Sequence, residues 1–141
     1  GRALVSLPTT ALTNAMRLPL VRMGFAVDVI ADPEEAARRA EQGGHKLLAT
    51  ARVIAAAGQP PTLFQRLGRL SQTTRRQVFV ILVGEDLKTG DGTQAFVSAA
   101  DLVVHPADLG SCDALLQIAL AERQRLFQAF LDAQRRLETS A

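Results

Sequence analysis

Residues 78–106 constrain the fold most, because they hold two short apolar runs joined by a helical segment. The first run, Val78 to Gly84, is apolar without alternation and ends at a glycine. A run this short and rich in Val, Ile and Phe predicts a strand buried on both faces. A turn-rich loop and a helical pattern at Gln94–Ala100 lead to the second run, residues 102–104. This order predicts a right-handed parallel crossover.

The rest of the chain repeats the same alternation. Further strands are predicted at Ala3–Leu7, Phe25–Ile30 and His45–Ala51. Helices are predicted after caps at Thr9 or Thr10, Asp32, Thr62 and Ser111, the last running to about Glu138. Pro19 should kink or divide the first helix, and the helix after Thr62 presents Leu63, Phe64, Leu67 and Leu70 on one face. Five strands alternating with five helices predict a parallel sheet covered on both faces.

Length and composition fit one domain, residues 1–141, with a core over 3–125 and a helical extension over 126–141. No apolar run is long enough to span a membrane, and the lone Cys112 fits a reducing cytoplasm. At a helix start, this thiol should have a slightly lowered pKa. Because the first strand begins almost at once, we expect the chain to be part of a larger protein.

Element order and three local phrases give the chain a family resemblance. The phrases are Arg22-x-Gly24-Phe25-x-Val27, a helix opening Pro33-Glu34-Glu35-Ala36, and the run AADLVVHP at 99–106. Over residues 3 to about 125, the sequence resembles the receiver domain of bacterial two-component response regulators. The resemblance implies an α/β, flavodoxin-like, doubly wound five-stranded parallel sheet of order 2-1-3-4-5. It also implies helices on both faces and a cis peptide before Pro106. The extended C-terminal helix follows from the sequence itself, which has no helix breaker before about Glu138.

The chemistry of that family needs an acid pair for Mg²⁺, an acceptor Asp, a hydroxyl and a Lys. The corresponding positions here are Leu7 and Pro8, Ala51 (or Thr50 if the register slips by one residue), Val83 and His105. No Asp or Glu occurs between residues 1 and 27 or between 43 and 84. Without a carboxylate nucleophile, no aspartyl phosphate can form. The sequence therefore predicts a non-catalytic pseudo-receiver, a signalling module with no cofactor and no metal.

The loop after residues 78–84 permits a second interpretation. Ligands of parallel sheets bind at the carboxyl edge, so a small-ligand or phosphate sensor or enzyme could use this loop, through Gly84, Thr89, Gly90, Asp91, Gly92 and Thr93. His105 could contact a phosphate there. The competing interpretation makes Asp86 and Asp91 turn formers, Thr93 a helix cap and His105 a surface cap. Both interpretations stay open at this point.

The predicted last helix carries an apolar stripe beyond the point where a sheet can cover it. The stripe consists of Leu126, Phe127, Phe130 and Leu131, at spacings of three and four residues. Such a stripe predicts that the chain binds a protein partner or forms a homodimer. The predicted binding surface combines this stripe with the face formed by the fourth helix and the fifth strand. The alternative is a helix that bends back. Nucleic acid is not expected, because the arginines Arg66, Arg69, Arg75 and Arg76 lack interleaved aromatic residues and fit a solvated face.

Overall fold

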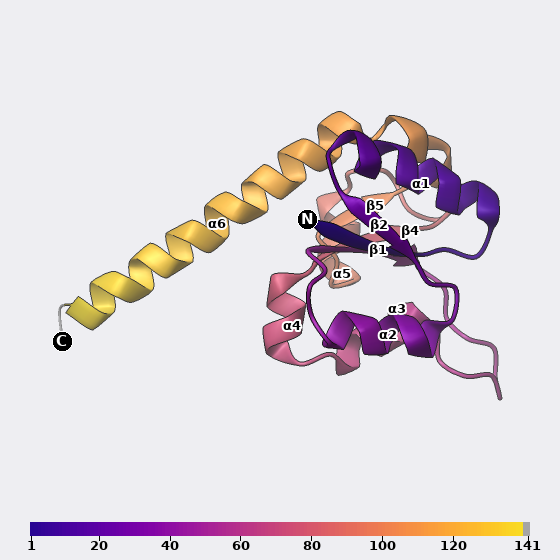
Figure 1. The fold of residues 1–141 in the computed structure, drawn as a ribbon, viewed down its shortest axis with the longest axis horizontal. Coiled ribbons are helices and arrows are strands. Elements are labelled where there is room, and N and C mark those ends of the chain that lie inside the picture. The colour runs from indigo at the N-terminus through magenta and orange to yellow at the C-terminus, as the bar shows by residue number, and fades with distance from the viewer. Residues whose placement is uncertain (140–141) are drawn as a thin grey trace.

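The computed structural model describes residues 1–139 as a five-stranded parallel sheet with helices on both faces and one long helix leaving the body (Figure 1). The strand order is β2-β1-β3-β4-β5, and each neighbouring pair is parallel. The predicted fold is thereby confirmed. The strands are β1 (Arg2–Ser6), β2 (Ala26–Val29), β3 (Leu47–Ala51), β4 (Phe79–Val83) and β5 (Leu102–Val104). The helices are α1 (Thr10–Arg22), α2 (Pro33–Glu41), α3 (Leu63–Arg66), η1 (Leu67–Arg69), α4 (Gln72–Gln77), α5 (Gly92–Val97), η2 (Pro106–Ser111) and α6 (Asp113–Thr139).

Alternate residues of the central strands enter two separate cores. Val5 and Ala49 face one core, which α1 and α6 close with Met16, Leu20 and Leu116. Their neighbours in sequence face a second core, which α2, α3 and α5 cover. The members of this core include Leu4, Leu48, Ala36, Leu63 and Ala95. Each fully buried Leu contributes roughly 1.5–3 kcal/mol. Burial on both faces explains why β4 reads as a continuous apolar run.

Side-chain caps begin most of the helices. Asp32 accepts a hydrogen bond from the backbone N–H of Glu35, with Pro33 in the first turn of α2. Thr62 and Gln65 form a complete capping box at α3. Pro19 does not divide α1, which runs on to Arg22. A proline removes a single intrahelical bond, and buried Pro19 and Leu20 hold the last turn of α1 against the body.

Two predicted helix boundaries are wrong. The segment after Thr62 is not one helix but α3, η1 and α4, because Leu70 is extended and Ser71 caps a new helix through the backbone N–H of Thr74. Ser111 does not cap the last helix. It ends the 3-10 helix η2, and the first helical bond of α6 runs from the N–H of Leu116 to the carbonyl of Cys112.

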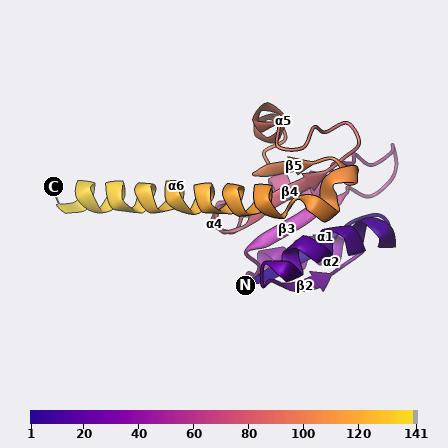
Figure 2. The same ribbon diagram turned by 90° about the horizontal axis from the view of Figure 1, so that it is seen from above.

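Helix α6 is anchored at its start and free over its second half. Leu116 is fully buried, and Leu115, Ala119 and Leu120 pack beside it, as predicted. Beyond these residues the helix runs straight away from the sheet (Figures 1 and 2). It does not bend back over its own body. Within residues 1–139, no helix combines the length and apolar character that crossing a membrane would require.

Candidate functional site

The carboxyl edge of the sheet brings together the five positions that the resemblance singles out. Leu7 and Pro8 follow β1, Ala51 and Val83 end β3 and β4, and His105 follows β5. Ala51 and Val83 are register partners. Leu7 and Val83 are buried, and Ala51 packs beside them in the same core. The centre of this edge is therefore lined by hydrocarbon.

The polar group nearest to Ala51 in sequence is already used by the fold. The hydroxyl of Thr50 is buried and donates to the carbonyl of Ser6 at 2.8 Å. This bond ties β3 to β1. A hydroxyl engaged in this way has no nearby base that would activate it as a nucleophile.

Arg52 closes the edge between β3 and α5. Its guanidinium donates to the carboxylate of Asp86 at 2.9 Å and to the hydroxyl of Ser98 at 3.1 Å. The same group lies 5.8 Å from the centre of the Phe64 ring. One cation thus joins the loop after β4, the end of α5 and the start of α3. Asp86, the second acid after β4, is thereby paired, while Glu85 before it is exposed.

The loop at residues 84–93 folds inward on an apolar side chain. Leu87 is 4% exposed and packs with the second core, against residues such as Leu82 and Val103. Gly84 leaves room for it, because a Cβ there would lie 2.9 Å from the Asp86 carboxylate and 3.2 Å from Leu87. Sequence reasoning missed Leu87, although it is the only large apolar residue in an otherwise polar loop.

Most polar groups of this loop bond within the chain. The N–H of Gly90 donates to the carbonyl of Val103, and that of Lys88 to the side chain of Gln94. Asp91, not Thr93, caps α5, because its carboxylate accepts from the backbone N–H of Gln94 at 3.0 Å. The turn-former interpretation of Asp91 therefore fits the geometry, and ligand binding by the loop stays a prediction.

His105 and Thr89 organise the turn after β5. The backbone N–H of His105 donates to the Thr89 hydroxyl at 2.8 Å, and that hydroxyl donates to Asp108 at 2.6 Å. The Nδ1 of His105 accepts from the N–H of Ala107, so the ring caps η2. The expected cis peptide before Pro106 is wrong, since residues 1–139 contain no cis bond. Pro106 instead opens η2, and this 3-10 helix makes the turn.

A magnesium ion, which the receiver resemblance implies, does not fit the residues at this edge. Mg²⁺ requires several oxygen ligands in octahedral geometry. Leu7, Pro8 and Ala51 offer no side-chain oxygen. Asp86 and Asp108 are bonded to Arg52 and Thr89, and Glu85 is a single exposed carboxylate. Over residues 1–139, no group of three or more His, Cys, Asp or Glu side chains could hold a metal.

Cys112 lies at the start of α6 but is not an activated thiol. It is 3% exposed, and its Sγ contacts the carbonyl of Leu109 at 3.3 Å. Burial raises the pKa of the Cys112 thiol, and the nearby charge of Asp113 raises it further. The predicted lowering of this pKa is wrong, because desolvation of the thiolate outweighs the effect of the helix N-terminus.

The amino edge of the sheet holds a charged cluster that sequence reasoning missed. Asp28 accepts three hydrogen bonds from Arg2, at 2.7, 2.8 and 3.2 Å, and lies 2.8 Å from Nε2 of His45. Hydrogen bonding to Arg2, and secondarily to His45, lowers the pKa of Asp28. The signal in the sequence was Asp28 itself, which interrupts the alternation of β2. Its partners come from β1 and from the loop before β3, so local patterns could not identify them.

Two arginines fix the root of α6. Arg22 of α1 binds Asp113, and Arg123 binds Asp101 at 2.9 Å and the carbonyls of Val78 and Arg76. The Arg123 guanidinium also lies 5.9 Å from the centre of the Phe79 ring. Sequence reasoning overlooked Arg123, which is the single cation on the otherwise apolar face of α6. Such an isolated cation on an apolar stripe indicates a buried polar partner.

The distal stripe of α6, defined as Leu126, Phe127, Phe130 and Leu131, lies past this root. Leu126 is 65% exposed, Phe127 50% and Phe130 59%, while Leu131 is partly covered. At about 100° per residue, the distal stripe continues the face that Leu116 and Leu120 turn toward the body. Its exposure leaves a large apolar surface that no element within residues 1–139 covers.

Comparison with known proteins gives structural likeness only. No protein-family model matches the sequence, and no curated protein is significantly similar to it. Among solved structures, a CheY-like receiver domain protein from Methanospirillum hungatei is 17% identical, with a TM-score of 0.63 and coverage of 88% of this chain and 96% of that one. A receiver domain of a sensor histidine kinase from Pseudomonas aeruginosa, solved with magnesium in its active-site cleft, is 15% identical, with a TM-score of 0.58 and coverage of 87% and 97%.

A third solved structure matches the chain over its long helix as well. It is a fusion that contains a trimeric coiled-coil segment of yeast Spc42, 14% identical, with a TM-score of 0.61. The match covers 98% of this chain and 87% of that one. At these identities, the likeness establishes the fold and nothing finer.

Proposed function

We propose that this chain, which has the fold of a response-regulator receiver domain, is a non-catalytic interaction module in signalling. One observation carries the proposal: the edge where receivers hold their oxygen ligands is lined here by Leu7, Ala51 and Val83. The neighbouring acids Asp86 and Asp108 are bonded within the chain. A hydrocarbon surface can neither bind Mg²⁺ nor accept a phosphoryl group.

The output surface in this proposal is the distal stripe of α6, and its partner is a second copy of the chain. The polar residues Arg125, Gln128 and Asp132 lie on the opposite side of the helix at about 100° per residue. A helix with one apolar seam and one polar side is typical of a coiled coil. The likeness to a fusion that includes a trimeric coiled coil covers α6 as well and supports helix-mediated association in general.

The first experiment tests the chemistry. The protein is incubated with acetyl phosphate and Mg²⁺, and its intact mass is measured. We expect no mass increase at any side chain, because Ala51 replaces the acceptor carboxylate. A stable phospho-adduct on the native chain would contradict the proposal directly.

The second experiment tests the assembly. Phe127→Ser combined with Phe130→Ser should convert a dimer into a monomer by light scattering, since the seam loses both aromatic side chains. Ile118→Ser is the matched control. Ile118 is 61% exposed on the same helix, but lies about 120° around the axis from Phe130. The Ile118→Ser variant should keep the dimer mass in light scattering. A native chain that is already monomeric at high concentration would refute the dimer.

The alternative function, a ligand sensor at the loop of residues 84–93, can be separated from this one. A thermal-shift screen with nucleotides, phosphate and divalent ions is expected to give no shift. A shift of several degrees that disappears in Thr93→Ala or His105→Ala would favour the sensor over the interaction module.

A further inference from the structure

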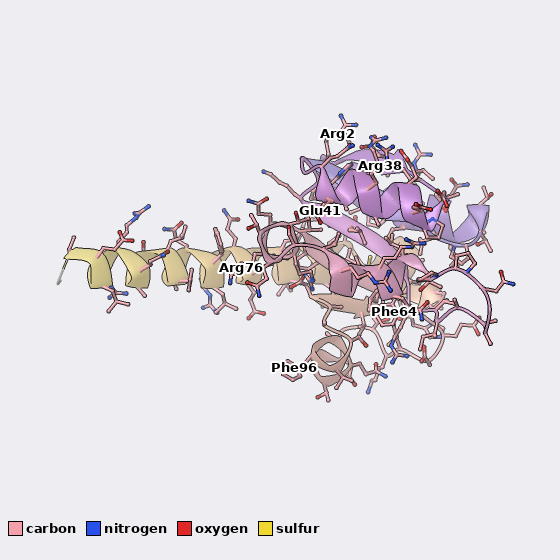
Figure 3. The ribbon with its side chains drawn as sticks, turned by 90° about the horizontal axis from the view of Figure 1, so that it is seen from below. Arg2, Arg38, Glu41, Phe64, Arg76 and Phe96 are labelled. Carbon is pink, nitrogen blue, oxygen red and sulfur yellow. The ribbon has the colours of Figure 1, made fainter. Side chains whose placement is uncertain are left out.

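A groove lies between the α3–η1–α4 segment and the turn that follows α5. Its volume is about 800 Å³. Phe64, Leu67 and Leu70 supply apolar side chains, and Ala99 lines the opposite wall. The groove reaches the root of α6, where Arg76 lies beside the helix (Figure 3). It adjoins the carboxyl edge, since its Phe64 and Ser98 also contact Arg52, and it is separate from the distal stripe.

The charged side chains that line the groove are mostly cationic. They are three arginines, Arg75, Arg76 and Arg123, and one acid, Asp101. Arg75 and Arg123 both turn to Asp101, at 3.6 and 2.9 Å, and Asp101 is the one acid that lines the groove among residues 1–139. Two guanidinium groups on one carboxylate leave an excess of positive charge.

Two further arginines are available to a ligand. Arg76 lines the groove. Arg69 does not line it but is the residue before Leu70, which does, and both arginines are exposed. Neither guanidinium has a hydrogen-bond or ion-pair partner within residues 1–139. An Arg fork without a partner is suited to bidentate binding of a carboxylate.

We propose that this groove docks an acidic segment of a partner protein, one that places apolar side chains between Asp and Glu residues. The apolar wall of Phe64, Leu67 and Leu70 would take the apolar side chains, and Arg69 and Arg76 would bind the flanking carboxylates. Charge decides against a second copy of this chain as the occupant, because the free part of α6, residues 124–139, carries three arginines and two acids. The apolar wall favours protein over nucleic acid, since a phosphate backbone would not use it.

The test uses a labelled helical peptide of roughly 16 residues with Leu and Phe at spacings of three and four and Glu and Asp between them. Fluorescence anisotropy should show saturable binding to the whole chain that weakens as salt rises. Two matched peptides, one with Gln and Asn for the acids and one with Ser for the apolar residues, should each bind at least about tenfold more weakly. Amide chemical-shift changes should fall on residues 64–76 and 98–101.

The variants locate the interaction. Arg69→Glu with Arg76→Glu should weaken peptide binding by about tenfold or more, while the oligomeric state set by α6 stays unchanged. Arg17→Glu is the control, because Arg17 is an exposed arginine on α1, far from the groove lining. Lack of saturable binding, an equal loss in Arg17→Glu, or tighter binding of a short single-stranded DNA at the same arginines would each overturn the proposal. None of these results bears on the phosphorylation or dimer tests.

Discussion

Arg22 and Asp113, which are 91 residues apart in the chain, form an ion pair with two hydrogen bonds, at 2.8 and 2.7 Å. The guanidinium of Arg22 also donates a hydrogen bond to the carbonyl of Gly110 at 2.9 Å. The last turn of α1 is thereby fastened to the first turn of α6. The pair lowers the pKa of Asp113 and raises that of Arg22, in both cases mainly through the hydrogen bonds between them.

Asp113→Asn should lower stability at neutral pH and have little effect in acid. A carboxylate with a lowered folded-state pKa stabilises the fold above its unfolded-state pKa, and this contribution disappears as the pH falls through the folded-state pKa. The difference between native and variant should therefore narrow below about pH 4. Urea unfolding at pH 7 and pH 3 measures it. Asp132→Asn, on exposed distal α6, is the control, and a pH-independent difference for Asp113→Asn would contradict the explanation.

Ala99→Gly should stabilise the protein by about 1 kcal/mol. Ala99 follows α5 with φ at 55°, the one non-glycine residue with positive φ among those described. Glycine adopts this conformation without the steric penalty of a Cβ. The same change at Ala121, in the middle of α6, should destabilise by about 1 kcal/mol. Denaturant midpoints that moved in the same direction for both variants would show that Ala99 does not hold the strained positive-φ conformation.

Arg123→Leu should destabilise by about 1–3 kcal/mol, because the Asp101 carboxylate and the carbonyls of Val78 and Arg76 lose a donor. Arg125→Leu is the matched control. It replaces an exposed arginine two residues later and should change stability by less than about 0.5 kcal/mol. The free energy of unfolding in guanidinium chloride is measured for both variants. Equal losses would show that the Arg123 contacts do not contribute to stability in solution.

Ala51→Asp should restore an acid at the end of β3 without restoring phosphorylation. The new carboxylate would lack the acid pair that the resemblance places after β1, because Leu7 and Pro8 stand there. Magnesium would lack the remaining oxygen ligands it requires. Intact mass after incubation with acetyl phosphate and Mg²⁺ should match the untreated variant. A phosphoryl group on this variant alone would mean that another group supplies the metal site.

The sequence predicted the fold because its signals are local. Unbroken apolar runs such as residues 78–83, and caps such as Asp32, specify element type and order without knowledge of distant contacts. Predictions failed where two local signals compete. Ser71 caps a new helix within what reads as one amphipathic segment, and burial of Cys112 outweighs its place at a helix start.

The interactions that close the sites were beyond the reach of sequence patterns. Arg52 with Asp86, and Arg123 with Asp101, join elements 34 and 22 residues apart. Periodicity reports which face of an element is buried but not which charge lies opposite. The exposed stripe on α6 was predictable for the converse reason: it depends on helix length and spacing alone.

The contacts of Asp113 and Arg123 fix the first part of α6 to the body, and the rest of the helix projects from it as a free arm. From Arg123 to Thr139 the free arm is about 24 Å long at 1.5 Å per residue. A tilt of about 10° at the base of this arm would carry the tip through roughly 4 Å. Because Arg123 also lines the groove, the base of this arm lies beside the proposed docking site.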